Sequence, residues 1–266
     1  MNTQELSVSL DSCLQQGQVV DRNWLKDKGF NRPLVDYYVR CGTLQLVTRG
    51  MYCRPGPPLK WEHIVYSLQQ LGVPCHVGGR SALDLQGMAH YLSLQGVKQI
   101  HLYGMEKLPG WVNRIDQRLM AAPVEFVYHK LSWFNVFPND ALTGIPFGHW
   151  DWPVIYAKAE LALLELAADI KTVADFDFLN KYFESATALR PKLIRELLLS
   201  AKHVKAKRLF LWFAKRQGYA WFNKVDLSGI DLGSGKRVVL EGGALDSDYQ
   251  ITVPRNMVNG SEQSFF

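Results

Sequence analysis

Residues 31–54 read NRPLVDYYVRCGTLQLVTRGMYCR, and this stretch decides the fold of the first part of the chain. Asn31 is a favourable helix N-cap, and Pro33 stands in the first turn, where a missing amide hydrogen costs nothing. Apolar side chains then recur at helical spacing as far as Cys41, and Gly42 can close the helix. The stretch therefore opens with a short capped helix.

Two β-prone runs follow this helix, at residues 44–47 and 51–54. Thr48, Arg49 and Gly50 separate them, and the glycine can take the positive φ that a tight hairpin turn needs. The second half of the stretch thus predicts a β-hairpin.

Two more helices are predicted upstream, over residues 3–16 and between Asp21 and Gly29. Three helices followed by a hairpin are typical of a winged helix-turn-helix, whose third helix enters the major groove of DNA. The same fold also serves as a protein-docking module. DNA binding is the interpretation that we favour, and docking is the alternative.

A stiff break at Pro55-Gly56-Pro57-Pro58 marks the expected domain boundary. We expect a winged helix over residues 1–56, a larger effector domain over 57–258 and a flexible tail over 259–266. The fold class is α+β, with a mixed α/β second domain that becomes mainly helical toward its C-terminal part. Its expected strands are 73–77, 97–103, 124–128, 236–240 and 249–253. Its expected helices are 61–71, 80–85, 156–168, 173–185, 191–200 and 204–217. Residues 136–152 are expected to form a packed loop.

Charge is distributed in blocks along the chain, although the net charge is only +5. Seven Lys and Arg face two Asp between Arg22 and Arg54, and twelve face three acidic residues between Arg190 and Arg237. The segment from Phe137 to Thr187 reverses the sign, with eight acidic residues against three Lys. Two basic segments of this kind favour a polyanion such as DNA.

Basic and polar positions on the third helix, the wing and one later helix are the candidate DNA contacts. Arg32 stands at the N-terminus of the third helix, where bidentate bonding to guanine is favourable. Lys202, Lys205 and Arg208 recur every three residues and predict one exposed stripe, which contacts either DNA or the acidic region 169–177 of the same molecule. The full set is Arg22, Arg32, Tyr37, Arg40, Thr48, Arg49, Lys202, Lys205 and Arg208.

Several other classes of protein find no support in the sequence. No secretory signal opens it and no run of about eighteen apolar residues occurs, so we expect a cytoplasmic protein. The four cysteines form no CxxC pair, and the histidines form no HExxH motif, so we expect reduced cysteines and no metal. The stretch from Gly148 to Trp152 places His149 beside Asp151, and we interpret it as a buried loop rather than a catalytic base. We expect no catalytic residue and no cofactor.

The sequence resembles the AbiEi family, the antitoxins of abortive-infection type IV toxin–antitoxin systems. The resemblance rests on motifs spread in order along nearly the whole chain. These motifs are LVTRGMY at 46–52, GRSALDLQGM at 79–88, KAKRLFLW at 205–212, DLGSGKR at 231–237 and ITVP at 251–254.

This resemblance implies a bacterial repressor of its own operon. Such a protein binds inverted repeats in its promoter through the N-terminal domain. Its C-terminal domain counteracts a nucleotidyltransferase-like toxin without forming a stable complex with it.

A glycine turn at Gly233-Ser234-Gly235-Lys236-Arg237 supports a rival interpretation. Glycines let backbone amides approach a phosphate, and a lysine adds charge. The spacing departs from the Walker pattern, because Arg237 stands where that pattern requires Ser or Thr. The alternative is therefore a nucleotide-dependent transferase in which the winged helix is a docking module.

Overall fold

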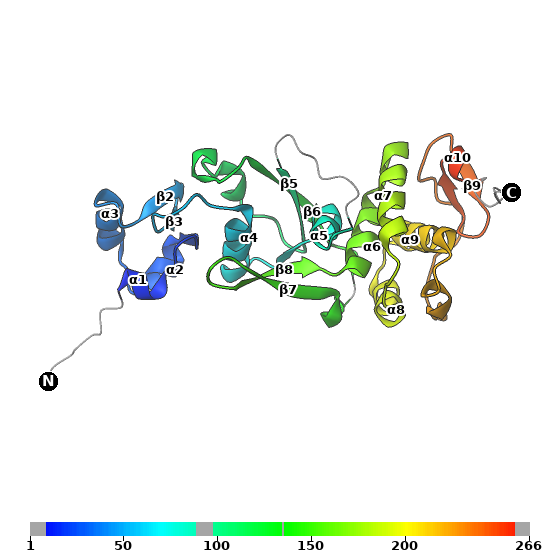
Figure 1. Cartoon of the computed structure of the whole chain (residues 1–266), viewed down its shortest axis with the longest axis horizontal. Coiled ribbons are helices and arrows are strands. Elements are labelled where there is room, and N and C mark those ends of the chain that lie inside the picture. Colours follow the sequence, from blue (N-terminus) through cyan, green and yellow to red (C-terminus); the bar gives the residue numbers. More distant parts are fainter. Residues whose placement is uncertain (1–8, 89–97, 135, 259–266) are drawn as a thin grey trace. The chain divides into compact units, whose positions relative to one another are not determined.

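The computed structural model describes residues 9–88, 98–134 and 136–258 (Figure 1). The chain divides into two compact units. The first comprises residues 1–76, 95–130 and 144–155, and the second comprises residues 77–94, 131–143 and 156–266. The tail expected at 259–266 lies outside the described residues.

Three helices and a three-stranded sheet form the N-terminal part of the first unit. The helices are α1 (Leu10–Cys13), α2 (Arg22–Asp27) and α3 (Arg32–Arg40), and the strands are β1 (Val20–Asp21), β2 (Gln45–Thr48) and β3 (Met51–Cys53). The sheet has the order β1-β3-β2, with both pairs antiparallel. This arrangement is the predicted winged helix-turn-helix, with β2 and β3 as the wing.

The capping residues that the sequence suggested hold the two later helices. The Asp21 carboxylate accepts a hydrogen bond from the Trp24 N–H at 2.7 Å, and Asn31 Oδ1 accepts one from the Leu34 N–H at 3.1 Å. Gly50 has a φ of +81° at the wing turn. The local sequence therefore determines where these elements begin and turn.

The first helix is shorter than the expected range 3–16. It ends at Cys13, because Leu14 already has an extended backbone (φ −119°, ψ 108°), and residues 3–8 lie outside the described part. Leu14 instead packs into the core of the winged helix. That core consists of Leu10, Leu14, Val20, Leu25, Phe30, Val35, Leu44 and Tyr52.

A five-stranded sheet follows the winged helix along the chain, and its strand order is β6-β5-β4-β8-β7. β5 pairs with β6 in parallel, and β4 pairs with β8 in parallel. The strands are β4 (Cys75–Val77), β5 (Lys98–Gly104), β6 (Val124–Lys130), β7 (Leu142–Phe147) and β8 (Trp152–Ala157), and helix α4 (Trp61–Gln70) precedes them.

Strands β7 and β8 replace the packed loop expected at 136–152 and the first residues of the helix expected from Tyr156. The turn between the strands contains Gly148 and Asp151, both with positive φ. Trp152, Val154 and Tyr156 are buried in β8, whereas Pro153 is exposed. This alternation has the period of a half-buried strand.

The second unit contains most of the longer helices. They are α5 (Gly79–Leu85), α6 (Ala159–Asp169), α7 (Val173–Ser185), α8 (Pro191–Ser200) and α9 (Val204–Gln217). The C-terminal part adds β9 (Ala244–Asp246), β10 (Ile251–Val253) and α10 (Arg255–Val258), and short 3₁₀ turns lie at 112–114, 117–119, 139–141 and 222–224. The strand expected at 236–240 is reduced to a single bridge between Arg237 and Ile251.

The winged helix is hydrogen-bonded to α4 within the first unit. The Val19 N–H donates to Ser67 Oγ at 2.8 Å in a buried position, and Trp152 Nε1 donates to Gln15 Oε1 at 2.7 Å. Gly17 allows this approach, because a Cβ there would lie 2.5 Å from the His63 ring. The winged helix thus shares a compact unit with most of the sheet, and the boundary at residue 56 stays a prediction.

Replacing Ser67 should test this attachment. Ser67→Ala leaves the buried Val19 N–H without its acceptor, which costs about 1–3 kcal/mol of the free energy of unfolding. Chemical denaturation measures the loss. Ser12→Ala is the control, since the Ser12 hydroxyl bonds a carbonyl at the exposed surface. An equal, small effect of both substitutions would contradict the prediction.

Candidate nucleic-acid interface

The exposed side chains of α3 lie at positions that the sequence selected for DNA. Arg32 begins the helix with a side chain that is 80% exposed, Tyr37 is 55% exposed, and Arg40 is exposed in the last turn. Val35 on the opposite side of the helix is buried. The helix therefore presents two cations and one phenol to solvent while its other face anchors it in the core.

The wing presents one cation at its tip. Arg49 is exposed between β2 and β3, and Thr48 beside it is half-buried. Met51, the first residue of β3, is buried and anchors the strand that follows the turn. A donor and a cation at this place suit phosphate oxygens.

Arg22 has a different environment from the other arginines of the winged helix. Its Nε donates to the Tyr52 hydroxyl at 2.7 Å, and its Nη2 lies 3.0 Å from the Asp36 carboxylate. It therefore connects the start of α2 to β3 and to α3. Asp36 also lies 3.8 Å from Arg32 Nε.

The ion pairs that Asp36 forms with Arg22 and Arg32 were not predicted from the sequence. Arg32 and Asp36 are four residues apart on one helix, a spacing at which side chains meet. That signal was present in the sequence, whereas the contact with Arg22 depends on how α2 packs on α3.

Of the two neighbouring tyrosines in α3, only Tyr37 is exposed to solvent. Tyr38 packs against the core of the winged helix and meets the Phe30 ring edge-on at 6.1 Å. Tyr38 therefore helps to anchor α3, and Tyr37 is the tyrosine of the pair that can contact a ligand.

The exposed stripe predicted from Lys202, Lys205 and Arg208 is wrong. Lys202 is exposed but precedes α9, the Lys205 ammonium donates to the Ile170 carbonyl at 2.9 Å, and Arg208 is only 3% exposed. Desolvation lowers the pKa of Lys205, and the nearby Asp169 opposes that shift. Lys205 thus contacts the acidic region of its own chain, which was the alternative interpretation.

The buried Arg208 guanidinium organises the glycine turn. Its Nε and Nη atoms donate to the carbonyl oxygens of Leu232, Gly233, Gly235 and Gln250 at 2.7–3.2 Å. The Gly233 N–H in turn donates to the Asp231 carboxylate. The turn therefore directs carbonyl oxygens toward a cation, the opposite of the arrangement that binds a phosphate.

The remaining sequence candidates give no site. His149 and Asp151 are exposed in the turn between β7 and β8, so the expected buried loop is wrong there. Cys53 and Cys75 are buried, and burial raises the pKa of each thiol to about 11. Within the described ranges, no cluster of three metal-ligating side chains occurs, and no helix is long and apolar enough to span a membrane.

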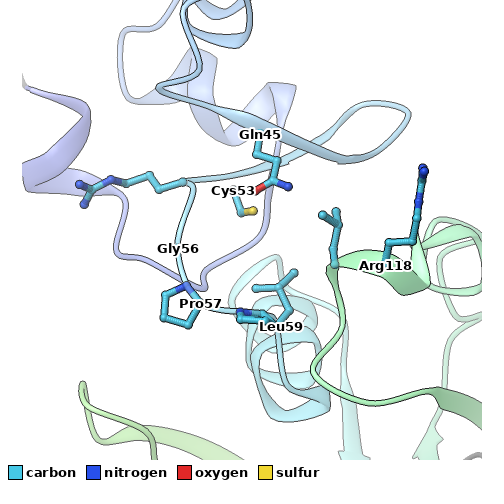
Figure 2. A pocket seen from close by; sticks show the side chains of 9 residues that line it. Gln45, Cys53, Gly56, Pro57, Leu59 and Arg118 are labelled. Atoms are coloured by element: carbon cyan, nitrogen blue, oxygen red, sulfur yellow. The ribbon is translucent and has the colours of Figure 1, made fainter.

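A small cavity of about 140 Å³ lies beside the Pro-rich segment, within the first unit (Figure 2). Gln45 and Cys53 of the wing strands line it, together with Pro57 and Leu59. Its two arginines are engaged elsewhere. Arg118 forms hydrogen bonds with both Asp116 carboxylate oxygens, and Arg54 pairs with Asp11 at 2.6 Å. The cavity therefore offers no uncompensated charge to a ligand.

Two family models match the chain. The model described as the N-terminal domain of the AbiEi antitoxin, a transcriptional regulator, matches residues 3–94. The model described as the transcriptional regulator, AbiEi antitoxin, of type IV toxin–antitoxin systems matches residues 97–254.

Comparison with solved structures supports the fold. The crystal structure of the RV2827C protein from Mycobacterium tuberculosis aligns with a TM-score of 0.52 and 16% identity, over 89% of this chain and 86% of that chain. At this identity the likeness concerns the fold alone. No curated protein matches the sequence.

Removing the Arg208 side chain should destabilise the protein without altering its exposed basic surface. Arg208→Ala leaves several carbonyl oxygens without donors, and we expect it to lower the free energy of unfolding by about 2–4 kcal/mol. Chemical denaturation followed by circular dichroism measures the loss. Lys236→Ala, an exposed cation of the same turn, should change stability by less than about 0.5 kcal/mol. Unchanged stability of Arg208→Ala would refute this role.

Proposed function

Because the chain belongs to the family of AbiEi antitoxins, the transcriptional regulators of type IV toxin–antitoxin systems, we propose that it binds double-stranded operator DNA through its winged helix. The exposed face of α3 carries the proposal, since Arg32, Tyr37 and Arg40 project from a helix whose other side is buried. A major groove accepts one such helix.

Each exposed group has a distinct role in this proposal. Arg32 stands at the N-terminal end of α3, the end that approaches base edges in helix-turn-helix proteins, and it reads a guanine. Arg40 and Arg49 neutralise phosphates on either side of the groove. Tyr37 and Thr48 add hydrogen-bonding hydroxyls, and Arg22 adds a cation beside Asp36, to whose carboxylate it donates a hydrogen bond.

The larger part of the chain supplies the antitoxin activity in the same proposal. Residues 57–258 counteract a nucleotidyltransferase-like toxin in the cytoplasm without a stable complex, while the winged helix represses the protein's own promoter. Support comes from the match of residues 97–254 to the antitoxin family model. The protein is then a regulator rather than an enzyme.

The carbonyl-lined turn around Arg208 gives no support to the rival nucleotide-dependent transferase. A nucleotide phosphate would need free backbone amides at that turn, whereas the Gly233 and Arg237 N–H groups donate to the Asp231 carboxylate and the Gln250 carbonyl. For this reason, we do not propose a transferase activity as a second function.

Two arginine substitutions should separate base reading from phosphate binding. Arg32→Ala should weaken operator binding by about 1–3 kcal/mol and relax the preference at one operator position. Arg49→Ala should weaken operator and scrambled duplexes alike and lower the salt slope by roughly one. Salt titrations with fluorescence anisotropy on both duplexes measure these effects. Equal losses on both duplexes for Arg32→Ala would assign it to the phosphate backbone and overturn its reading role.

DNA binding and toxin neutralisation should be separable in the full-length protein. A variant with Arg32→Ala and Arg49→Ala keeps all residues of the proposed antitoxin domain, so it should still rescue cells that express the cognate toxin from an unrelated promoter. Colony counts and immunoblots of the wild type and of this double variant provide the measurement. Loss of rescue at normal protein levels would show that operator binding is part of neutralisation.

A further inference from the structure

Asp36 is the single acidic residue of α3, and it lies on the face that we assign to DNA. Its carboxylate lies 3.0 Å from Arg22 Nη2 and 3.8 Å from Arg32 Nε. The Asp36 side chain is 47% exposed, so a phosphate backbone would meet its negative charge directly. A carboxylate at this place repels the phosphates of any duplex and so weakens DNA binding whatever the base sequence.

The contact between Asp36 and Arg22 is shorter than the contact between Asp36 and Arg32. Arg22 also donates to the Tyr52 hydroxyl, and Tyr52 is buried, so this guanidinium has a second fixed partner. Among the described residues, Arg32 has only the longer contact, and its side chain is 80% exposed. Arg32 can therefore leave Asp36 for another acceptor, whereas Arg22 stays and keeps the carboxylate in position.

We propose that Asp36 sets the discrimination between operator and other DNA, by competing with phosphates for Arg32 and by accepting a hydrogen bond only from a correctly placed cytosine. This inference rests on the proposed function, because it assigns a role within the same DNA-binding face.

The physical basis is the difference between bases and phosphates as partners. On a non-operator duplex, the phosphates repel Asp36 and must take Arg32 from it, so binding is weakened. On the operator, guanine O6 and N7 accept from Arg32, and the N4 amino group of a nearby cytosine donates to Asp36. A group that repels wrong partners and pairs with the right one produces specificity without raising the operator affinity.

A purely structural role for Asp36 makes a different prediction. If its carboxylate only holds α2 against α3 through Arg22, its loss weakens the domain and lowers binding to every duplex. The proposed role instead requires that non-operator binding becomes stronger when the charge is removed.

Asp36→Asn in the full-length protein tests the proposal, with a labelled duplex of the chain's own promoter and a scrambled duplex of equal length. At about 0.1 M salt, we expect binding to the scrambled duplex to tighten by roughly 3–10-fold, with a salt slope steeper by about one, and binding to the promoter to change by less than about twofold. Asp36→Gln repeats the test with a longer neutral side chain.

The matched control is Asp27→Asn, which makes the same change of net charge. Asp27 is the exposed last residue of α2 and forms no ion pair with the described residues. Control binding should change by less than about twofold on either duplex, and thermal unfolding checks that all variants are folded. Asp36→Glu retains the charge and should retain most of the discrimination.

The outcomes distinguish the inference from the function on which it rests. If the wild-type protein binds neither duplex, the proposed function is wrong and the role of Asp36 falls with it. If the wild-type protein binds DNA but Asp36→Asn binds both duplexes equally more weakly, or matches Asp27→Asn, Asp36 is structural and only the inference is overturned.

Discussion

The hydrogen bonds from Arg208 to four backbone carbonyls are the interaction on which the C-terminal part of the fold depends. The segment from 226 to 250 contains little regular secondary structure, so its carbonyl oxygens have few partners of their own. Helix α9 supplies donors to this segment along its length: Arg208 bonds carbonyl oxygens, whereas the Trp212 indole and the Lys215 ammonium bond the carboxylates of Asp246 and Asp248. A basic helix thus takes the place of the missing strand pairs.

The arginines of the winged helix have a different environment from that of Arg208. Arg22 and Arg32 face a carboxylate at the surface, whereas Arg208 faces carbonyl oxygens in the interior. Breaking a surface ion pair costs little, so Arg32 can exchange Asp36 for a base. Removing a buried guanidinium from its acceptors costs much more. The partner and the burial of each arginine, and not its place in a basic segment, decide whether it can act on a ligand.

The sequence predicted those parts of the fold in which local signals determine the structure. Helices α7, α8 and α9 begin and end where expected, because Thr172 caps the first, Pro191 opens the second and Gly218 takes a left-handed conformation after the third. Strands β7 and β8 were missed because Gly, Pro and aromatic residues obscured their alternation. The basic stripe on α9 failed for another reason: spacing groups residues on one face of a helix but does not tell whether solvent or protein covers that face.

The attachment of the winged helix to α4 changes how the Pro-rich segment at 55–58 is interpreted as a connection between the two parts. Prolines and glycines there suggested a joint between independent parts. However, Val19 bonds to Ser67 and Gln15 bonds to Trp152, so two contacts outside the segment also fix the winged helix. The Val19 hydrogen bond is buried, and breaking it would leave an amide N–H without an acceptor, which opposes movement of the winged helix away from α4. Within the first unit, the segment is therefore not the sole connection between the winged helix and the residues that follow it. A DNA-bound α3 would consequently fix the orientation of the sheet in the first unit as well.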